Sequence, residues 1–341
     1  MTVVAAAISA VEHLPLPDGV LRAGIAALVE RTARRLRGAP AGAERSFATQ
    51  MREHPIALFP HDANAQHYEV PPDFFAQVLG PRLKYSCCLY PDARTTLAQA
   101  EEFALAETAE HAALADGQEI LELGCGWGSL TLWMAERFPA ARITAVSNSA
   151  PQRAHIERQV ALRGLANVQV ITADMNSFTI DRRFDRVVSV EMFEHMSNWP
   201  RLLANVQGWL RRDGRLFLHV FSHQATPYRF DHRDRDDWIA QHFFTGGIMP
   251  SHNLIRHVAE HFELEGEWRW SGRHYQRTAQ DWLARMDDRS EAVEALLRAT
   301  YGRDWVVWRR RWRLFFLATA GLFGARGGSE WGVSHYRLRP V

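Results

Sequence analysis

The sequence has few cysteines and no long hydrophobic run. Its three cysteines, Cys87, Cys88 and Cys125, offer neither a paired disulfide framework nor the spacing of zinc ligands, which favours a reducing compartment. The apolar stretch near the N-terminus is too short to span a bilayer and lacks the basic start of a signal peptide. We therefore expect a cytoplasmic protein without a transmembrane helix.

Net charge is also nearly absent, because 40 Lys and Arg residues stand against 39 Asp and Glu. This balance gives no electrostatic reason to expect a nucleic-acid partner. Lys84 is the only lysine, so almost all of the positive charge is arginine. The basic run Arg-Arg-Arg-Trp-Arg at 309–313 is a local exception. It indicates either a solvated helix face or a peripheral contact with the inner face of a membrane.

The stretch around which the chain is organised is 119–128, a short apolar run that breaks into three alternating glycines. Residues 120–123 fit a buried parallel strand. Gly124, Gly126 and Gly128 allow a tight turn and the close approach of a ligand to the backbone. The pattern indicates a nucleotide-like cofactor, and the alternative is a purely structural turn between a strand and a helix.

From this loop onward, strand and helix patterns alternate. The strands are nearly continuously apolar, as expected when helices cover both faces of a parallel sheet. The fold class is therefore α/β, a doubly wound, mostly parallel, Rossmann-like sheet. We predict helices at 129–138, 150–163 and 200–211, and strands at 142–147, 168–173, 185–190 and 214–221.

The flanking regions have different patterns. Residues 19–37 and 95–113 are helical in pattern, and 263–271 and 330–338 form a late strand pair with a helical insert between them. We expect the N-terminal helices and the insert to form a lid over the carboxyl edge of the sheet, where ligands bind in this architecture. The predicted domains are an N-terminal helical cap at 1–110, a cofactor-binding core at 111–222, and a helical substrate-binding insert with the last two strands at 223–341.

Polar side chains follow the second and third strands of the core. Ser147, Asn148 and Gln152 stand where a dinucleotide dehydrogenase usually has an acidic residue for the ribose, which disfavours that class. Gln152 either binds a ribose or is an exposed polar residue at a helix start. Asp174 and Met175 would flank an adenine ring, and Asp174 could equally cap a turn or helix.

Several segments together resemble the cyclopropane-fatty-acid synthase-like family of S-adenosylmethionine-dependent methyltransferases. This family contains lipid cyclopropane synthases, mycolic-acid methyltransferases and coclaurine N-methyltransferases, so the resemblance implies S-adenosylmethionine as cofactor and a class I methyltransferase fold. The likeness spans about residues 65–338. It is carried by 85–87 (Tyr-Ser-Cys), 122–128 (Glu-Leu-Gly-Cys-Gly-Trp-Gly), 147–152 and 184–196, and supported by 67–68, 246–251 and 274–278.

The resemblance also implies roles for individual residues. In the lipid branch, a bicarbonate ion acting as base would be held by the backbone of Cys87 and by Glu194, His219 and Tyr275. In the N-methylating branch, the acid/base pair would be Glu191 and His195. The residues expected to bind the cofactor are Tyr85, Ser86, Gly124, Gly126, Ser147, Asn148, Gln152, Asp174 and Met175.

The acceptor is expected to be a lipid or another small molecule. Cys87 and Tyr275, which the N-methylating branch tends to lack, favour methyl transfer to the double bond of an unsaturated acyl lipid. The alternative acceptor is a small amine, because 148–149, 195–198 and 236–238 look more like the N-methyltransferases. A non-catalytic binding module is disfavoured, because the acid/base residues are all in place. The oligomeric state is open, a homodimer included.

Overall fold

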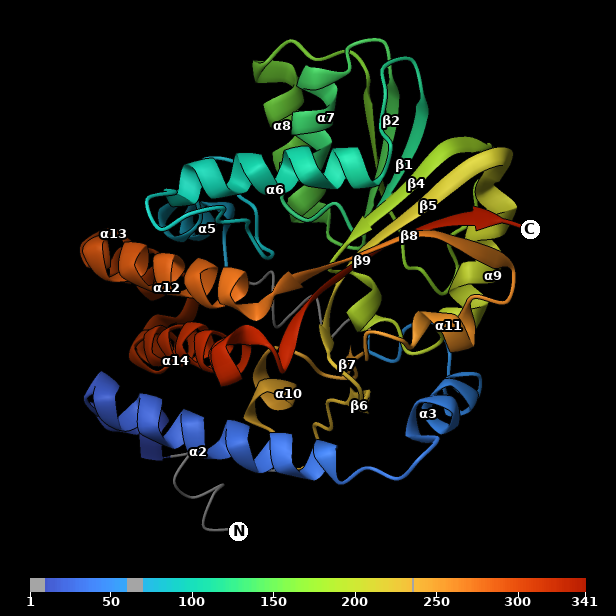
Figure 1. The fold of residues 1–341 in the computed structure, drawn as a ribbon. Helices are drawn as coiled ribbons and strands as arrows, with labels where there is room; N and C mark the ends of the chain where they lie inside the picture. The colour runs from blue at the N-terminus through green and yellow to red at the C-terminus, as the bar shows by residue number, and fades with distance from the viewer. Residues whose placement is uncertain (1–9, 60–69, 235) are drawn as a thin grey trace.

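The computed structural model describes residues 10–59, 70–234 and 236–341, so the His-Tyr segment at 67–68 lies outside the described residues. A seven-stranded sheet forms its centre, with the strand order β3-β2-β1-β4-β5-β9-β8 (Figure 1). The first five strands in this order are parallel, and β9 and β8 are antiparallel to their neighbours. The strands are β1 (Glu119–Leu123), β2 (Arg142–Ser147), β3 (Val168–Thr172), β4 (Phe184–Val190), β5 (Leu210–His223), β8 (Phe262–Ser271) and β9 (Trp331–Pro340).

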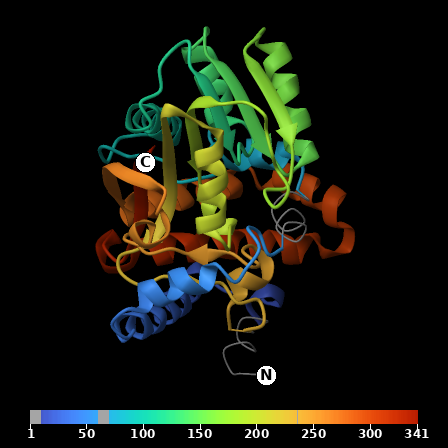
Figure 2. The ribbon, with the colours of Figure 1, turned by 90° about the vertical axis from the view of Figure 1, so that its right-hand side faces the viewer.

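Helices cover both faces of this sheet, as the apolar strands predict. On one face, α6 (Leu97–His111) and α7 (Ser129–Arg137) share a buried cluster with strand residues, and α8 (Ala150–Leu162) lies beside α7. On the other face, α9 (Trp199–Trp209) and α3 (Ala43–Met51) pack with side chains of β1, β4 and β5. Figure 2 shows α9 lying across its face of the sheet. The predicted doubly wound α/β fold is confirmed.

Most predicted elements end within two residues of the observed ones, and the largest difference lies between α9 and β5. The helix predicted at 200–211 ends at Trp209, and the strand predicted at 214–221 runs from Leu210 to His223. The reason is that Leu210 already pairs with Phe184 of β4, and a register shift then brings the two strands into regular pairing. A tertiary contact therefore ends this helix earlier than its own apolar pattern indicates.

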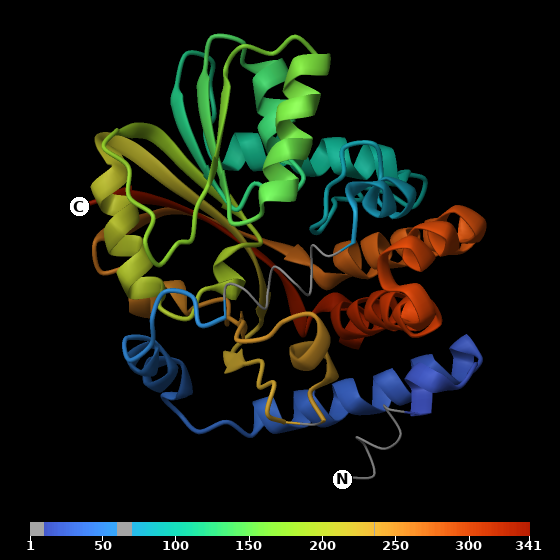
Figure 3. The same ribbon diagram turned by 180° about the vertical axis from the view of Figure 1, so that it is seen from behind.

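The N-terminal helices and the insert between β8 and β9 pack together beyond one end of the sheet (Figures 1 and 3). The α14 helix packs against α2 and α12, and α5 packs against α12 and α13. Aromatic side chains fill this region; Trp312, for example, contacts the rings of Phe74, Phe243 and Phe316. The helices are α2 (Asp18–Arg37), α5 (Pro72–Val78), α12 (Gly272–Asp288), α13 (Ser290–Tyr301) and α14 (Trp305–Gly324).

Shorter elements complete the chain around the carboxyl edge of the sheet. A two-stranded sheet pairs β6 with β7, and short helices connect the longer elements. These elements are β6 (Tyr228–Arg229), β7 (Ile248–Met249), α10 (Trp238–His242), α11 (Ile255–Val258) and the 3-10 helices η1 (Phe193–His195), η2 (Gly302–Asp304) and η3 (Ala325–Gly328).

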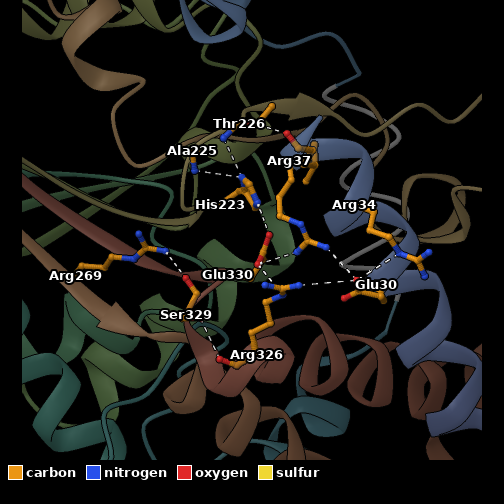
Figure 4. Close-up of polar contacts among 11 residues, drawn as sticks. Glu30, Arg34, Arg37, His223, Ala225, Thr226, Arg269, Arg326, Ser329 and Glu330 are labelled. Atoms are coloured by element: carbon orange, nitrogen blue, oxygen red, sulfur yellow. Dashed lines mark hydrogen bonds and ion pairs between the residues drawn. The ribbon is translucent and has the colours of Figure 1, made fainter. Parts of the chain in front are cut away.

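A buried carboxylate fastens α2 to the core. Glu330 is 1% exposed and lies 3.5 Å from Arg37 Nη1, 3.4 Å from Arg326 Nε and 3.4 Å from His223 Nε2 (Figure 4). The three partners come from α2, η3 and the end of β5. Removing Arg37 or Arg326 would leave the buried carboxylate of Glu330 with less positive charge beside it. The ion pair between Arg37 and Glu330 therefore holds α2 against the core.

The basic run at 309–313 is engaged in contacts between helices. Its arginines lie on α14. Three of them pair with acidic side chains of α2, α12, α13 and the segment before α2, and Arg310 donates to the backbone carbonyl of Glu12. The ion pairs are Arg309 with Glu294, Arg311 with Glu12, and Arg313 with Asp18 and Asp287. Within the described residues, no helix is both long and apolar enough to cross a membrane.

Candidate active site

The carboxyl ends of β1, β2, β3 and β4 meet at one cavity. Most of the residues predicted to bind the cofactor line it, together with Glu191 and His195. Tyr85 and Ser86 line an adjoining cavity, which shares Gly124, Gly126 and Glu191 with the first. The lining residues that the sequence predicted are Gly124, Gly126, Ser147, Asn148, Gln152, Asp174, Met175, Glu191 and His195.

The glycine loop shapes this cavity. Gly124 and Gly126 both have positive φ, at 80° and 53°, which side chains rarely adopt. A Cβ on Gly124 would lie 2.5 Å from the side chain of Met192. No heavy atom lies within 4 Å of the Cβ position of Gly126, so a side chain there would project into the space that the loop surrounds. The loop therefore leaves room for a ligand against its backbone.

Gln152 presents a hydrogen-bond donor at this cavity. Its Oε1 accepts from the Ser147 hydroxyl at 2.6 Å, which fixes the orientation of the amide. Its Nε2 is buried and has no hydrogen-bond partner among the described residues. Because a buried N–H without a partner is unfavourable, this group fits a ligand hydroxyl such as that of a ribose. The side chain is 1% exposed, so the interpretation of Gln152 as a surface residue was wrong.

Asp174 closes a turn and also lines the cavity. Its Oδ1 accepts a hydrogen bond from the backbone N–H of Asn176 at 2.9 Å, so it closes the turn after β3. It also lines the cavity beside Met175. The open backbone at Gly126, the amide of Gln152 and this carboxylate together fit the methionine, ribose and adenine parts of S-adenosylmethionine.

Glu191, directly after β4, is the centre of the polar site. Its Oε1 accepts from the backbone N–H of Cys87 at 2.9 Å and lies 3.2 Å from Nε2 of His219, and its Oε2 accepts from the Tyr275 hydroxyl at 2.6 Å. The backbone N–H of Glu191 donates to the carbonyl of His219. Its φ is +48°, a strained value for a non-glycine residue that sets where the carboxylate points.

Glu194 lies apart from these donors. The sequence grouped Glu194 with Cys87, His219 and Tyr275, but the structure places Glu191 among them. One oxygen of Glu194 accepts from the backbone N–H of Phe221 at 2.6 Å, and the other is buried without a hydrogen-bond partner among the described residues. The reason is that Glu194 sits on η1, one turn beyond the end of β4.

Burial and neighbouring charge shift the pKa values of both carboxyl groups. The pKa of Glu191 is raised overall, because burial outweighs the opposing effects of the Lys84 charge and of the hydrogen bonds from Cys87 and Tyr275. Burial raises the pKa of Glu194 well above its ordinary value, and the nearby Glu191 raises it further. Two close carboxyl groups do not both ionise readily, so these shifts favour Glu191 as the ionised member of the pair.

Behind Glu191 runs a row of three buried histidines. The Nδ1 atom of His219 lies 2.8 Å from Nε2 of His335, and Nδ1 of His335 lies 2.8 Å from Nδ1 of His111. His219 and His335 are directly paired across β5 and β9. Burial lowers the pKa of both well below the ordinary value, so both are neutral. If Glu191 is ionised, His219 Nε2 carries its proton, and the N–H groups of the row all point toward that carboxylate.

Sequence reasoning missed His335, His111 and Lys84 as parts of this site. His335 is the inward-facing partner of His219 on a late strand, so correct pairing of β5 and β9 would have found it. Lys84 directly precedes the Tyr-Ser-Cys segment, and its identity as the only lysine was the available signal.

His195 lies on the same cavity wall as Glu191. Its ring stacks on Phe244, with centroids 4.5 Å apart and planes 16° from parallel. Phe244 also contacts the edge of Phe221, and Tyr275 stacks on Phe323. Glu191 and His195 therefore line one cavity, and an aromatic ring packs against the imidazole of His195.

Comparisons with known proteins agree with this geometry. A family model described as mycolic acid cyclopropane synthetase matches residues 60–325. The chain is 35% identical over 290 residues to (S)-coclaurine N-methyltransferase of Thalictrum flavum subsp. glaucum, which covers 84% of this chain and 80% of that protein. It is 29% identical over 271 residues to cyclopropane-fatty-acyl-phospholipid synthase of Escherichia coli strain K12, which covers 79% of this chain and 66% of that protein.

A solved structure gives the same result. Coclaurine N-methyltransferase bound to N-methylheliamine and SAH superposes on this chain with a TM-score of 0.92 and 31% identity, covering 99% of this chain and 100% of that one. The family resemblance seen in the sequence is thus confirmed, and with it the use of S-adenosylmethionine. The chain belongs to the mycolic acid cyclopropane synthetase family and is an S-adenosylmethionine-dependent methyltransferase.

Proposed function

We propose that this methyltransferase transfers the methyl group to the nitrogen of a small secondary amine. The observation that carries the proposal is the position of Glu191. Its carboxylate engages Cys87 N–H, His219 and the Tyr275 hydroxyl, the groups that the lipid hypothesis assigned to a bicarbonate ion. The chain thus supplies its own carboxylate where that hypothesis requires an added base.

The comparisons support the same acceptor class. The (S)-coclaurine N-methyltransferase is more similar in sequence than the Escherichia coli cyclopropane synthase, with 35% against 29% identity. The coclaurine N-methyltransferase structure covers 99% of this chain and 100% of its own, and it contains N-methylheliamine, an N-methylated ligand. The sequence favoured an unsaturated acyl lipid, and these two observations favour the amine instead.

Glu191 is proposed as the base. A carboxylate offers about four acceptor positions, of which the three donors here occupy three, so one remains on Oε2 for the proton of an amine. The donors hold the carboxylate in one orientation and stabilise its ionised form. S-adenosylmethionine, when bound, supplies a methyl group already activated by its sulfonium.

His195 is proposed as the second acid/base residue. It lies on the cavity wall with Glu191, and its stacking on Phe244 fixes the plane of its ring. The aromatic side chains around both residues limit water and favour the neutral, nucleophilic form of the amine. The chain therefore orients the acceptor nitrogen and removes its proton, without a nucleophile of its own.

The experiment that tests this function presents both acceptor classes to one enzyme. Purified protein is incubated with labelled S-adenosylmethionine and, in parallel, with a panel of secondary amines and with vesicles of unsaturated phospholipid. Mass analysis should find N-methylated amines and unmodified lipid. The amine rate should not change when carbonate is stripped from the buffer. Methylated or cyclopropanated acyl chains whose formation depends on carbonate would overturn the proposal in favour of the lipid.

A further inference from the structure

Lys84 is a buried cation whose own contacts are all to neutral atoms. Lys84 is the only lysine of the chain and is 2% exposed. Its Nζ donates to the Ser86 hydroxyl at 2.6 Å and to the carbonyl oxygen of Cys87 at 2.6 Å. Among the described residues, no carboxylate forms an ion pair with it. A buried ammonium without a contacting anion is unfavourable, so its charge needs compensation from further away.

The nearest polar connection leads to Glu191. Lys84 binds the carbonyl side of Cys87, while the N–H of Cys87 donates to Glu191 Oε1 at 2.9 Å. Lys84 and Glu191 also line the same cavity. The backbone of Cys87 thus lies between the Lys84 ammonium and the carboxylate of Glu191, the proposed base.

We infer that Lys84 is the counter-charge of Glu191, and that its ammonium keeps this base ionised inside a site that excludes water. The inference rests on the proposed function, since it assigns Lys84 a positioning role for the same base. Desolvation of Glu191 favours the protonated acid, which takes up no proton from an amine. A cation fixed behind the loop opposes this effect without occupying a position on the carboxylate.

A lysine suits this position better than an arginine. The ammonium is compact and makes its two contacts within one short loop, whereas a guanidinium is planar and larger. Elsewhere the chain uses arginine for every basic position. The single exception therefore falls where a point charge has to fit inside the protein.

Other titratable groups face this pair and bear on its charge. Around Glu191 these are the Cys87 thiol, Glu194, His219 and Tyr275. Lys84 is the cation whose charge acts on Glu191.

The surroundings of Lys84 contain further acids. Glu101 of α6 accepts from the backbone N–H groups of Arg82 and Lys84, and the charge of Lys84 lowers the pKa of this carboxyl group against the effect of burial. Burial keeps the nearby Cys88 thiol neutral by raising its pKa, and Glu122 lines the same cavity. Losing Lys84 would therefore remove a positive charge that acts on both Glu191 and Glu101.

The test compares Lys84→Gln with Lys84→Met. Glutamine keeps a hydrogen-bond donor for the loop but removes the charge, and methionine removes both. In each variant the acid limb of the kcat–pH profile for an amine should move to higher pH by roughly one unit or more, and raising the pH should restore the rate. If Lys84→Gln has the same pH profile as the unmodified enzyme, Lys84 only holds the loop through its hydrogen bonds. That result would overturn the inference.

Arg186→Gln is the matched control. Arg186 also donates to backbone carbonyls, those of Ala112, Ala113 and Asp185, but near the amino end of β4, away from the site. Its loss should lower stability and leave the midpoint of the pH profile unchanged. Arg186 is partly buried, so a shift equal to that of the Lys84 variants would show a general effect of removing a cation from the protein, which contradicts the inference.

A second measurement needs no acceptor. Labelling lysine with ¹⁵N gives a single side-chain resonance, because Lys84 is the only lysine. This resonance should shift as Glu191 ionises, and the shift should be absent in Glu191→Gln. If the Lys84 resonance does not respond to the ionisation of Glu191, the inference that Lys84 is its counter-charge is wrong, whatever the acceptor is. If it responds while no amine is methylated, the counter-charge stands and the proposed function is wrong.

Discussion

The Tyr275 hydroxyl donates a 2.6 Å hydrogen bond to the carboxylate of Glu191. This contact joins α12 of the insert to the end of β4, although 84 residues separate the two in the chain. The insert therefore contributes a side chain to the polar site. This contact places Glu191, the proposed base, among the donors of that site.

Glu191→Gln should reduce turnover of an amine by roughly 10²–10⁴-fold, the usual range for loss of a general base. Cofactor affinity, measured by calorimetric titration, should change little. Glu194→Gln is the control, because Glu194 is buried beside the site but bonds only to Phe221 among the described residues. The opposite order, with Glu194→Gln far slower than Glu191→Gln, would contradict the assignment of the base.

Tyr275→Phe should lower kcat by roughly 10- to 150-fold, because it removes one hydrogen bond to a charged group, about 1.5–3 kcal/mol. The acid limb of the kcat–pH profile should also move to higher pH, because that hydrogen bond favours the ionised form of Glu191. Tyr336→Phe provides the comparison: its hydroxyl donates to the carbonyl of His252, outside the site. Equal losses of kcat in both variants would mean that Tyr275 acts through stability alone.

Gly126→Val should abolish cofactor binding in a folded protein. The branched side chain would enter the open space at the loop, and valine is strained at a φ of +53°. Gly164→Val controls for the strain, because Gly164 has a φ of +64° and equally open surroundings but does not line the cavity. Binding of S-adenosylhomocysteine, followed by calorimetry, should be lost only in the first variant; binding retained there would remove the loop from the cofactor site.

Gln152→Ala should weaken cofactor binding by about 1–2 kcal/mol, the value of a hydrogen bond to a ribose hydroxyl. The side chain of Gln152 is buried at the cavity, whereas Gln159, two turns later on α8, bonds to Arg163 at the surface. Gln159→Ala should therefore bind as the unmodified protein does. If the dissociation constant does not change in Gln152→Ala, its amide does not contact the cofactor.

Stability should fall as pH rises from about 4.5 toward about 7 through the ionisation of Glu122. Burial raises the pKa of this carboxyl group from 4.5 to about 7, although the Thr131 hydroxyl bonds to it. The folded state thus binds more protons than the unfolded state in this window, so the contribution decreases with pH, by about 3 kcal/mol for such a shift.

Glu122→Gln should remove this part of the pH dependence. Chemical denaturation at several pH values measures it for both proteins without cofactor. Parallel curves for Glu122→Gln and the unmodified protein across this window would show that Glu122 ionises normally.

The sequence alone determined the sheet and most of the residues that line the cavity at its carboxyl edge. The apolar strands and the glycine loop at 119–128 are local patterns, and the parallel sheet follows because each strand has to be buried on both faces. Gln152 and Asp174 also follow from local position, since each comes just after a strand that ends at the same edge. These features need no long-range contact to be recognised.

Only the tertiary structure decided which carboxylate meets the donors. Glu191 and Glu194 are three residues apart in the same motif, and either could have been the partner of Cys87, His219 and Tyr275 by sequence. Those donors come from three distant segments, and the positive φ of Glu191 directs its carboxylate among them. The inferred role of Lys84 as counter-charge of Glu191 also depends on the fold. Lys84 is buried, and a charge acts more strongly on its neighbours inside the protein than at the surface.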